Sequence, residues 1–326
     1  MKFRKLLSAA AIAALAMTTQ VAAQPEVKFG HVGEPGSLMD RSATEFAKRA
    51  NEKLGDKAKV TVYGSSQLGS DTAMLQKLKL GTIDLALPST VMSSAVDEFG
   101  LFEMPYLVED REHMARIRDE IVNPQLVPLA EKQGYIIIGI WENGFRQITN
   151  NKRPIVTPED LKGIKLRVPS GEWRVKMFQA YGANPSPMAL SEVFVALQTG
   201  VMDGQENPYA QIYPSRFYEV QKYLSISNHV YTPAFVTAGR SFAKFDPEVQ
   251  QILRDTAVEM QDEVYRIAAE LDVDLLEKLK AEGLEVNEVD TPAFIEASKE
   301  IYTEFSDAVP GTAEMIEKAQ ELAPAG

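Results

Sequence analysis

Short apolar segments alternate with longer segments of helical periodicity along most of the chain. The apolar segments predict buried β-strands, because runs of roughly four to eight apolar residues bounded by turn residues have the length of a strand rather than of a helix. They lie at 27–31, 60–63, 83–87, 135–141 and 165–168. The helical segments lie at 38–54, 72–80, 111–133, 172–181 and 190–199. This alternation is typical of an α/β fold and predicts parallel sheets with helices on both faces.

A longer helical pattern begins at Asp246 and Pro247, a capping residue and a first-turn proline, and ends at Gly283, a common helix stop. Unbroken, about 37 residues would span roughly 55 Å, whereas a small domain is roughly 30 Å across. The helix must therefore kink or cross two lobes. A coiled coil is the alternative, although the apolar spacing drifts between three and four residues. We expect a long helix spanning two α/β lobes, with a ligand cleft between them.

The N-terminal segment has the pattern of a signal peptide. Three basic residues within the first five positions precede an apolar stretch at 6–17, and residues 21–23 fit a cleavage site. The apolar stretch is shorter than the roughly 20 residues of a membrane-spanning helix. We expect residues 1–23 to be removed and the protein to work in the periplasm of a Gram-negative cell. A buried N-terminal helix is the alternative.

Composition excludes several functional classes. The 326 residues contain no Cys and three His, so thiolate chemistry, iron–sulfur clusters and cysteine zinc sites are excluded, and no two His have the spacing of metal ligands. The net charge of −12 argues against nucleic acid or an anionic membrane surface as a partner. No nucleophile elbow, phosphate-binding loop or dinucleotide-binding glycine motif is present. We therefore expect no enzyme activity, no cofactor and no metal.

Two residues stand out by their position. Arg167 lies inside an apolar strand that Pro169 ends, and a core strand carries an arginine only when the guanidinium is paired. The partner is either a carboxylate of the protein or a ligand. His31 ends the first strand, where an α/β lobe faces its ligand crevice. It is either a polar loop residue or a ligand contact.

Five motifs occur in a fixed order along the chain. They are Gln67-Leu68-Gly69, Gly144-Phe145-Arg146, Pro158-Glu159-Asp160 with Leu161-Lys162-Gly163, Leu166-Arg167-Val168-Pro169, and Leu197-Gln198-Thr199-Gly200 continuing to Asp203-Gly204-Gln205-Glu206-Asn207-Pro208. This set resembles the substrate-binding proteins of TRAP (tripartite ATP-independent periplasmic) transporters of the DctP type. The resemblance covers essentially the whole chain after residue 23.

The resemblance implies two α/β lobes that close on a ligand, with a long helix crossing both. It places 24–143 and 233–272 in lobe I, and 144–232 and 273–326 in lobe II. The implied function is the capture of a small organic acid and its delivery to a membrane permease driven by a sodium gradient. We expect a monomer. A binding component of a chemoreceptor or sensor kinase would share every cleft residue and is the alternative.

Three residues match the family's carboxylate-binding positions. Arg167 resembles the arginine that forms a salt bridge with the ligand carboxylate, a task that suits the two parallel donors of a guanidinium. Arg146 matches a second contact to a carboxylate or hydroxyl. Asn207 matches an asparagine that hydrogen-bonds the same end of the ligand.

The remaining candidates are less specific. Gln67, His31 and Ser89 fall where the first lobe supplies variable specificity contacts, and Trp173 forms either a wall of the site or part of the core. Asp71 matches an acidic position of uronate binders, although a helix N-cap explains it equally well. The ligand is either a C4-dicarboxylate or a hydroxylated monocarboxylate such as a sugar acid.

Overall fold

The computed structural model describes residues 24–324, and the segment interpreted as a signal peptide lies outside them. Two sheets form the body of the protein. The first sheet has the strand order β2-β1-β3-β10-β4. Its strands are β1 (Glu26–Gly30), β2 (Lys59–Tyr63), β3 (Leu85–Ala86), β4 (Ile136–Phe145) and β10 (Tyr231–Ala238). The first four follow predicted apolar segments, with β4 continuing four residues beyond the predicted end at 141, whereas β10 was not predicted.

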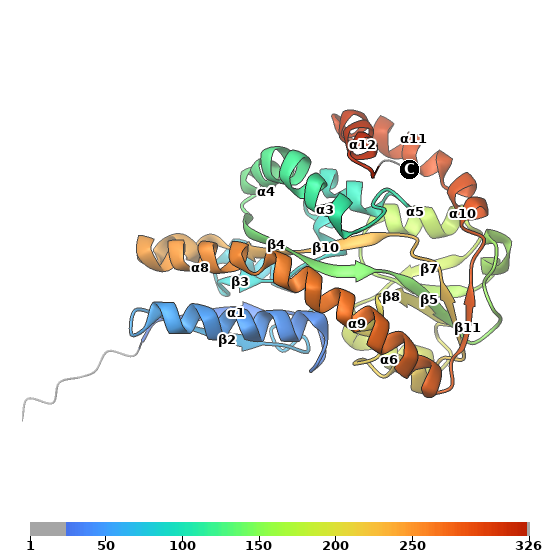
Figure 1. Ribbon diagram of the computed structural model, residues 1–326, viewed down its shortest axis with the longest axis horizontal. Helices are drawn as coiled ribbons and strands as arrows, with labels where there is room; N and C mark the ends of the chain where they lie inside the picture. The colour runs from blue at the N-terminus through green and yellow to red at the C-terminus, as the bar shows by residue number, and fades with distance from the viewer. Residues whose placement is uncertain (1–23, 325–326) are drawn as a thin grey trace, which may run out of the picture.

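The second sheet has the order β11-β9-β5-β8-β6-β7. Its strands are β5 (Gln147–Asn150), β6 (Lys165–Val168), β7 (Asn184–Pro187), β8 (Gly204–Asn207), β9 (Tyr223–Ile226) and β11 (Glu285–Glu288). The two sheets and the helices that cover them make the two α/β lobes predicted from the sequence. In Figure 1 the first sheet lies on the side of the N-terminus, and the second lies below α10 with β11 at its edge.

Neither sheet is wholly parallel, so the predicted parallel pairing is wrong in part. Strand β10 is antiparallel to β3 and β4, and β5 is antiparallel to β8 and β9. For β4 beside β10 and for β5 beside β9, the reason is the path of the chain between the lobes. It leaves the first sheet along β4 and enters β5 after one residue, Arg146, and it returns along β10. Outgoing and returning strands lie side by side and therefore run in opposite directions.

Twelve α-helices are described in residues 24–324. They are α1 (Leu38–Leu54), α2 (Asp71–Leu80), α3 (Arg111–Ile117), α4 (Val127–Lys132), α5 (Glu172–Ala180), α6 (Leu190–Gln198), α7 (Tyr209–Ile212), α8 (Pro247–Glu259), α9 (Gln261–Ala281), α10 (Thr291–Ala297), α11 (Lys299–Ala308) and α12 (Thr312–Glu321). The single helix predicted at 111–133 is divided by a π-helical segment, Arg118–Leu126, that contains Pro124. Proline lacks an amide hydrogen and clashes with the preceding turn, so the α-helical pattern cannot pass it unchanged.

The long helical pattern is present as α8 and α9, which meet at Met260. Asp246 caps α8 by accepting a hydrogen bond from the amide of Glu248 at 2.9 Å. Helix α8 packs on α1 and β4, and α9 continues along β4 to α7 beside the second sheet. The pair therefore runs across both lobes, as Figure 1 shows, and its apolar side faces this chain's own strands rather than a partner helix.

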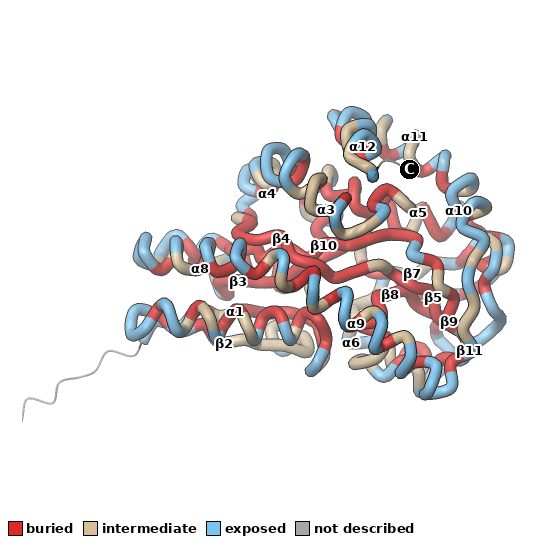
Figure 2. Tube along the Cα trace, in the orientation of Figure 1, coloured by how far each residue is buried: buried red, intermediate tan, exposed pale blue. Residues whose placement is uncertain are grey.

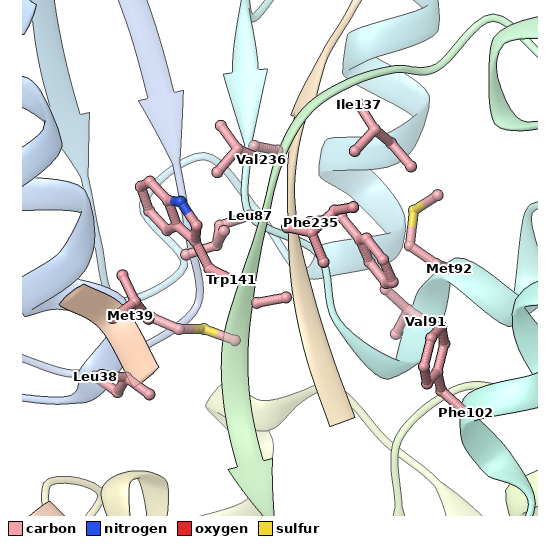
Figure 3. Packing of buried hydrophobic residues seen from close by; sticks show 14 of the residues in the cluster. Leu38, Met39, Leu87, Val91, Met92, Phe102, Ile137, Trp141, Phe235 and Val236 are labelled. Atoms are coloured by element: carbon pink, nitrogen blue, oxygen red, sulfur yellow. The ribbon is translucent and has the colours of Figure 1, made fainter. Parts of the chain in front are cut away.

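Aromatic residues fill the core of the first lobe. Trp141 lies edge-on to Phe29 and Phe46, with ring centroids 6.3 and 5.8 Å apart, and its Nε1 donates to the carbonyl of Ala257 at 2.9 Å. That bond ties β4 to α8. Phe235 lies on the other side of the sheet (Figure 3), and β4, β5, β8 and β10 are buried along almost their whole length (Figure 2).

Helix lengths and hydropathy also bear on membrane insertion. Within residues 24–324, none of the helices is both long and apolar enough to cross a bilayer.

Candidate functional site

A narrow cavity of about 30 Å³ lies between the two lobes. Asp71, Ser89, Thr90 and Asn143 line it from the first lobe. The second lobe contributes the polar residues Arg146, Arg167, Asn207 and Gln211. A single water molecule needs a cavity of roughly 10–15 Å³, so this cavity has room for only a few waters. The two lobes therefore lie close together in this structure.

Arg167 projects from β6 and is almost completely buried, with 4% of its surface exposed. Its Nε and Nη2 both donate to the carbonyl of Met188, at 2.9 and 2.6 Å. Among the described residues, no carboxylate lies within 4.0 Å of the guanidinium, and Nη1 has no acceptor. Burial lowers the pKa of Arg167 to about 10, so the group stays charged at neutral pH. A buried charge without a counterion is costly, which marks this position as unusual.

Arg146 sits at the crossing between β4 and β5 and is held by Glu206 in β8. Its Nη2 donates to the backbone carbonyl of Glu206 at 2.6 Å and to Oε1 at 3.0 Å, and its Nε donates to Oε2. Nη2 also donates to Oδ1 of Asn207 at 3.1 Å, and Nδ2 of Asn207 donates to Gln205 at 2.6 Å. The charge of Arg146 is therefore neutralised within the protein, and Asn207 supports it.

Glu206 is the centre of a buried ionic network. Besides Arg146, it pairs with Nη1 of Arg174 at 2.7 Å and with Nε2 of His229 at 3.1 Å. Arg174 also pairs with Glu103 at 2.7 Å, and all five side chains are buried. Burial alone would raise the pKa of Glu206, but Arg146 and Arg174 outweigh it and hold that pKa well below its usual range. Burial raises the pKa of Glu103 to about 7 despite Arg174.

The structure brings together four of the seven residues selected from the sequence. Arg167, Arg146, Asn207 and Ser89 all line the cavity, and Oγ of Ser89 donates to the carbonyl of Pro233 at 2.6 Å. The network behind them was missed, apart from Glu206 itself, which lies within a quoted motif. Nothing in the local pattern distinguishes Arg174, Glu103 or His229 from solvated residues.

The other three selected residues lie outside the cavity lining. His31 is buried under the loop after β2, packed so closely that a Cβ at Gly64 would lie 2.8 Å from its Cε1. Gln67 is exposed on that loop. Trp173 packs between α5 and α11, with its ring centroid 4.9 Å from that of Phe305. Trp173 therefore has the surroundings of a core residue.

The interpretation of Asp71 as a helix N-cap is wrong. The N-cap of α2 is Ser70, whose Oγ accepts from the amide of Ala73 at 3.3 Å. Asp71 is the first residue of the helix and lines the cavity. Its Oδ1 is buried without a hydrogen-bond partner in the described part of the chain. Burial raises the pKa of Asp71 to about 7, although Arg167 lowers it.

A larger groove, of about 630 Å³, lies elsewhere, between α11, α12 and the segment 105–109. Its lining contains Glu109, Asp307 and Glu317 against one cation, Lys299. This balance disfavours an organic anion, whereas the cavity between the lobes contains two guanidinium groups. Among residues 24–324, no cluster of three or more His, Asp or Glu side chains could hold a metal ion.

Comparison with known families decides the identity of the chain. Residues 29–308 match the family described as bacterial extracellular solute-binding protein, family 7 (DctP). The chain belongs to this family. The protein is thus a periplasmic solute-binding protein of the TRAP type, and members of this family are receptors rather than enzymes. The predicted family, the two-lobed α/β fold and the periplasmic location are confirmed.

Three relatives illustrate the match. The 2,3-diketo-L-gulonate-binding periplasmic protein YiaO of Escherichia coli is 32% identical, over 99% of this chain and 100% of that protein. A TRAP periplasmic solute-binding protein from Polaromonas sp. JS666, solved with bound D-erythronate, is 30% identical with a TM-score of 0.88, over 92% of this chain and 100% of that one. Another from Sulfurospirillum deleyianum, with bound succinate, is 33% identical with a TM-score of 0.87, over the same shares.

In this TRAP solute-binding protein, His31 makes a testable contribution to stability. Both ring nitrogens are buried without partners in the described residues, and burial lowers the pKa of His31 to about 4 from 6.5. Below pH 6.5 His31 becomes protonated in the unfolded chain, whereas in the folded protein it stays neutral until the pH falls to about 4. The contribution of the neutral ring is therefore complete above pH 6.5 and is lost as the pH falls toward 4.

We expect the free energy of unfolding of the wild type, relative to His31→Gln, to fall by about 2–3 kcal/mol between pH 7.5 and pH 4. Urea unfolding of both proteins at both pH values measures this difference. The comparison with the variant is needed because burial raises the pKa values of Glu103 and Glu142 to about 7. As the pH falls over the same range, these two groups increase the free energy of unfolding in both proteins and would mask the effect of His31. A difference that does not change with pH would contradict the prediction.

Proposed function

We propose that this TRAP solute-binding protein captures a small organic acid by its carboxylate and delivers it to membrane permease subunits. The observation that carries the proposal is Arg167: a buried guanidinium in the cavity between the lobes, with no carboxylate of the described chain within 4.0 Å. Two of its nitrogens are fixed by the carbonyl of Met188, which leaves Nη1 for a ligand. The acids named for the relatives support the same class of ligand.

Arg146 contributes in a different way in this proposal. Its Nε and Nη2 are used by Glu206 and Asn207, whereas Nη1 has no acceptor among the described residues. A ligand carboxylate would lie between the Nη1 groups of Arg146 and Arg167 and neutralise Arg167. The main role of Asn207 would be to hold Arg146 in place through its Oδ1, rather than to bind the acid itself.

Binding then requires the lobes to move. A cavity of about 30 Å³ is too narrow for a four-carbon acid, so the ligand enters an open form and the lobes close around it. Closure excludes water and strengthens the ion pair. Because a ligand shifts this equilibrium only by its preference for the closed form, the acid must contact both lobes. We propose that the protein does this as a monomer.

A thermal-shift panel tests acid capture. The protein is denatured and refolded to remove carried-over ligand, then mixed with succinate, D-erythronate, galactonate, galacturonate and 2,3-diketogulonate. A ligand at 100 times its Kd should stabilise the fold by roughly 2.7 kcal/mol, which raises Tm by several degrees. Neutral analogues such as erythritol and succinamide serve as controls. Equal shifts with acids and neutral analogues would contradict the proposal.

Delivery to a permease has its own test. Cells that lack this protein should lose uptake of the acid found in the panel, and uptake should return with the wild-type gene. Uptake that continues unchanged without the protein would contradict delivery while leaving acid capture intact.

A further inference from the structure

The C-terminal helices contact both lobes. Helix α10 packs on the segment Pro158–Leu161 and α11 packs on α5, both in the second lobe. Helix α12 packs instead on two segments of the first lobe, Asp97–Glu103 and Arg118–Leu126. The resemblance to the family places all of 273–326 in lobe II, but the chain returns to the first lobe at 309–311. Figure 1 shows α11 and α12 side by side above α5 and α3.

A buried histidine of the first lobe holds α12. Nδ1 of His113, in α3, accepts a hydrogen bond from the amide of Glu109 at 3.2 Å. Because an amide can only donate, the neutral ring carries its proton on Nε2. That nitrogen lies 2.7 Å from the carbonyl of Ala319 in α12 and donates to it. The side chain of His113 is fully buried, so this contact is closed to water.

Two further polar contacts fix the same end of α12. Nε of Arg116, in α3, donates to the carbonyl of Leu322 at 2.6 Å. Nζ of Lys318 lies 2.8 Å from a carboxylate oxygen of Glu120. Carbonyls at the C-terminal end of a helix lack partners within the helix and favour cationic donors. Helix α12 is therefore attached to the first lobe by its last turn.

Helix α11 is attached to the second lobe. The ring of Phe305 packs on Trp173 of α5, with centroids 4.9 Å apart. Glu304 pairs with Lys176 of α5 at 3.1 Å. Helix α11 also packs directly on α12. The two helices thus connect the lobes through side-chain packing, in addition to the strands and the long helix that cross between them.

The lobes touch closely where these helices meet. Gly100 lies in the first-lobe segment on which α12 packs, and a Cβ there would lie 2.6 Å from Cε2 of Phe305 and 2.7 Å from Cδ1 of Trp173. The cavity between the lobes is narrow in this same arrangement. The contacts of α11 and α12 therefore belong to the closed form, and contacts that are weaker in an open form favour closure.

We infer, resting on the proposed function, that α12 is a clamp that holds the lobes closed. Its bonds to His113, Arg116 and Glu120 stabilise the closed form relative to the open form. A contact of this kind raises the population of the closed form, and the affinity for the acid rises with that population. The clamp also slows release of the acid, because the lobes must open first.

The clamp variant carries Arg116→Ala and Lys318→Glu. The first change removes the donor to Leu322, and the second places a negative charge opposite Glu120. Neither residue lines the cavity. Titration calorimetry and stopped-flow kinetics measure affinity and release with three probe acids, D-erythronate, galactonate and succinate. We expect affinity to fall on the order of 10-fold for each acid that binds, mainly through faster release.

The matched control carries Arg153→Ala and Lys48→Glu. Arg153 donates to the carbonyls of Asp160 and Lys162 within the second lobe, and Lys48 lies beside Glu45 on the surface of α1. The control therefore also loses an arginine bonded to backbone carbonyls and reverses one surface charge, but each of these contacts lies within one lobe. Its affinities and release rates should equal those of the wild type.

The movement of the lobes can be followed directly because the sequence contains no Cys. Met39 of α1 and Leu190 of α6 line the cavity from opposite lobes. Fluorophores on Thr44→Cys and Glu192→Cys, two exposed positions of the same helices, report the distance between the lobes. Without ligand, the clamp variant should show a lower transfer efficiency than the wild type and the control, because its open form is more populated.

A purely structural role of α12 gives a different result. The clamp variant would then have a lower Tm but wild-type affinity, release rate and transfer efficiency, and this would overturn the inference. If the clamp variant does not fold, Lys318→Glu alone is measured in the same way, with a loss of affinity of roughly 3-fold expected. If no acid binds, the proposed function fails, and the transfer efficiency of the unliganded protein still decides whether α12 is a clamp.

Discussion

Replacing Arg167 by alanine is expected to weaken binding of the ligand acid by about 2–5 kcal/mol, roughly a 30-fold to several-thousand-fold loss. The reason is that the ligand carboxylate would be buried between the lobes without its counterion. Arg146 cannot take over, because the carboxylate of Glu206 already neutralises it, accepting from Nη2 at 3.0 Å and from Nε. Titration calorimetry with the tightest acid of the panel measures the loss.

The same substitution has a second, opposite signature in the protein without ligand. Because Arg167 has no carboxylate partner within 4.0 Å among the described residues, its removal should leave the unliganded protein at least as stable as the wild type. Arg167→Lys keeps the charge but loses the planar fork, so it should bind with intermediate affinity. Lys48→Ala, which removes one exposed cation from α1, should change neither property. Ligand affinity that survives Arg167→Ala would contradict the assignment.

Replacing Glu206 by glutamine is expected to destabilise the fold by about 3–5 kcal/mol, with a fall in Tm on the order of 10 °C. Three buried groups, Arg146, Arg174 and His229, lose their shared carboxylate in this variant. Glu103 remains as a partner for Arg174 alone. Urea unfolding at pH 7.5 measures the loss, and Glu172→Gln, an exposed member of a surface pair with Lys176, is the matched control with little expected change.

The pH dependence of this effect follows from the lowered pKa of Glu206. Its contribution is complete above the ordinary value of 4.5, because there both the folded and the unfolded chain carry the charge. It is lost only as the pH falls below 4.5 toward the lowered folded-state value. The free energy of unfolding of Glu206→Gln should therefore lie below that of the wild type at both pH 7.5 and pH 5.5, and the difference should narrow below pH 4.5. A difference already absent at neutral pH would show that Glu206 is dispensable.

Much of the fold could be predicted because its information is local. The amphipathic segment 38–54 has its caps and apolar face within its own sequence, and α1 spans the same residues. The long pattern after Asp246 likewise indicated a structure longer than one lobe. Strand direction is not local. The antiparallel placement of β10 beside β4 depends on where the chain crosses between the lobes, near Arg146, and no residue of either strand encodes it.

A residue of the site could be predicted where a charged side chain occurs within an otherwise apolar segment. Arg167 inside an apolar strand is such a case, and it lies in the cavity. Glu103 and Arg174 were not found, because a charged residue in a helical segment normally faces solvent, and only the packing of α5 against the segment containing Glu103 buries them. Asp71 shows the limit of a local rule, since serine at 70 and aspartate at 71 both fit a helix start and only the structure distinguishes them.

A crystal structure of the protein with the tightest acid of the panel would show whether Arg167 binds the ligand carboxylate between closed lobes. We expect closed lobes with a carboxylate oxygen about 2.7–2.9 Å from Nη1 of Arg167, the usual length of a charged hydrogen bond. We also expect Arg167 to keep its bonds to the carbonyl of Met188. An acid bound in closed lobes with its carboxylate away from Arg167, or an acid in the groove beside Lys299, would contradict this expectation.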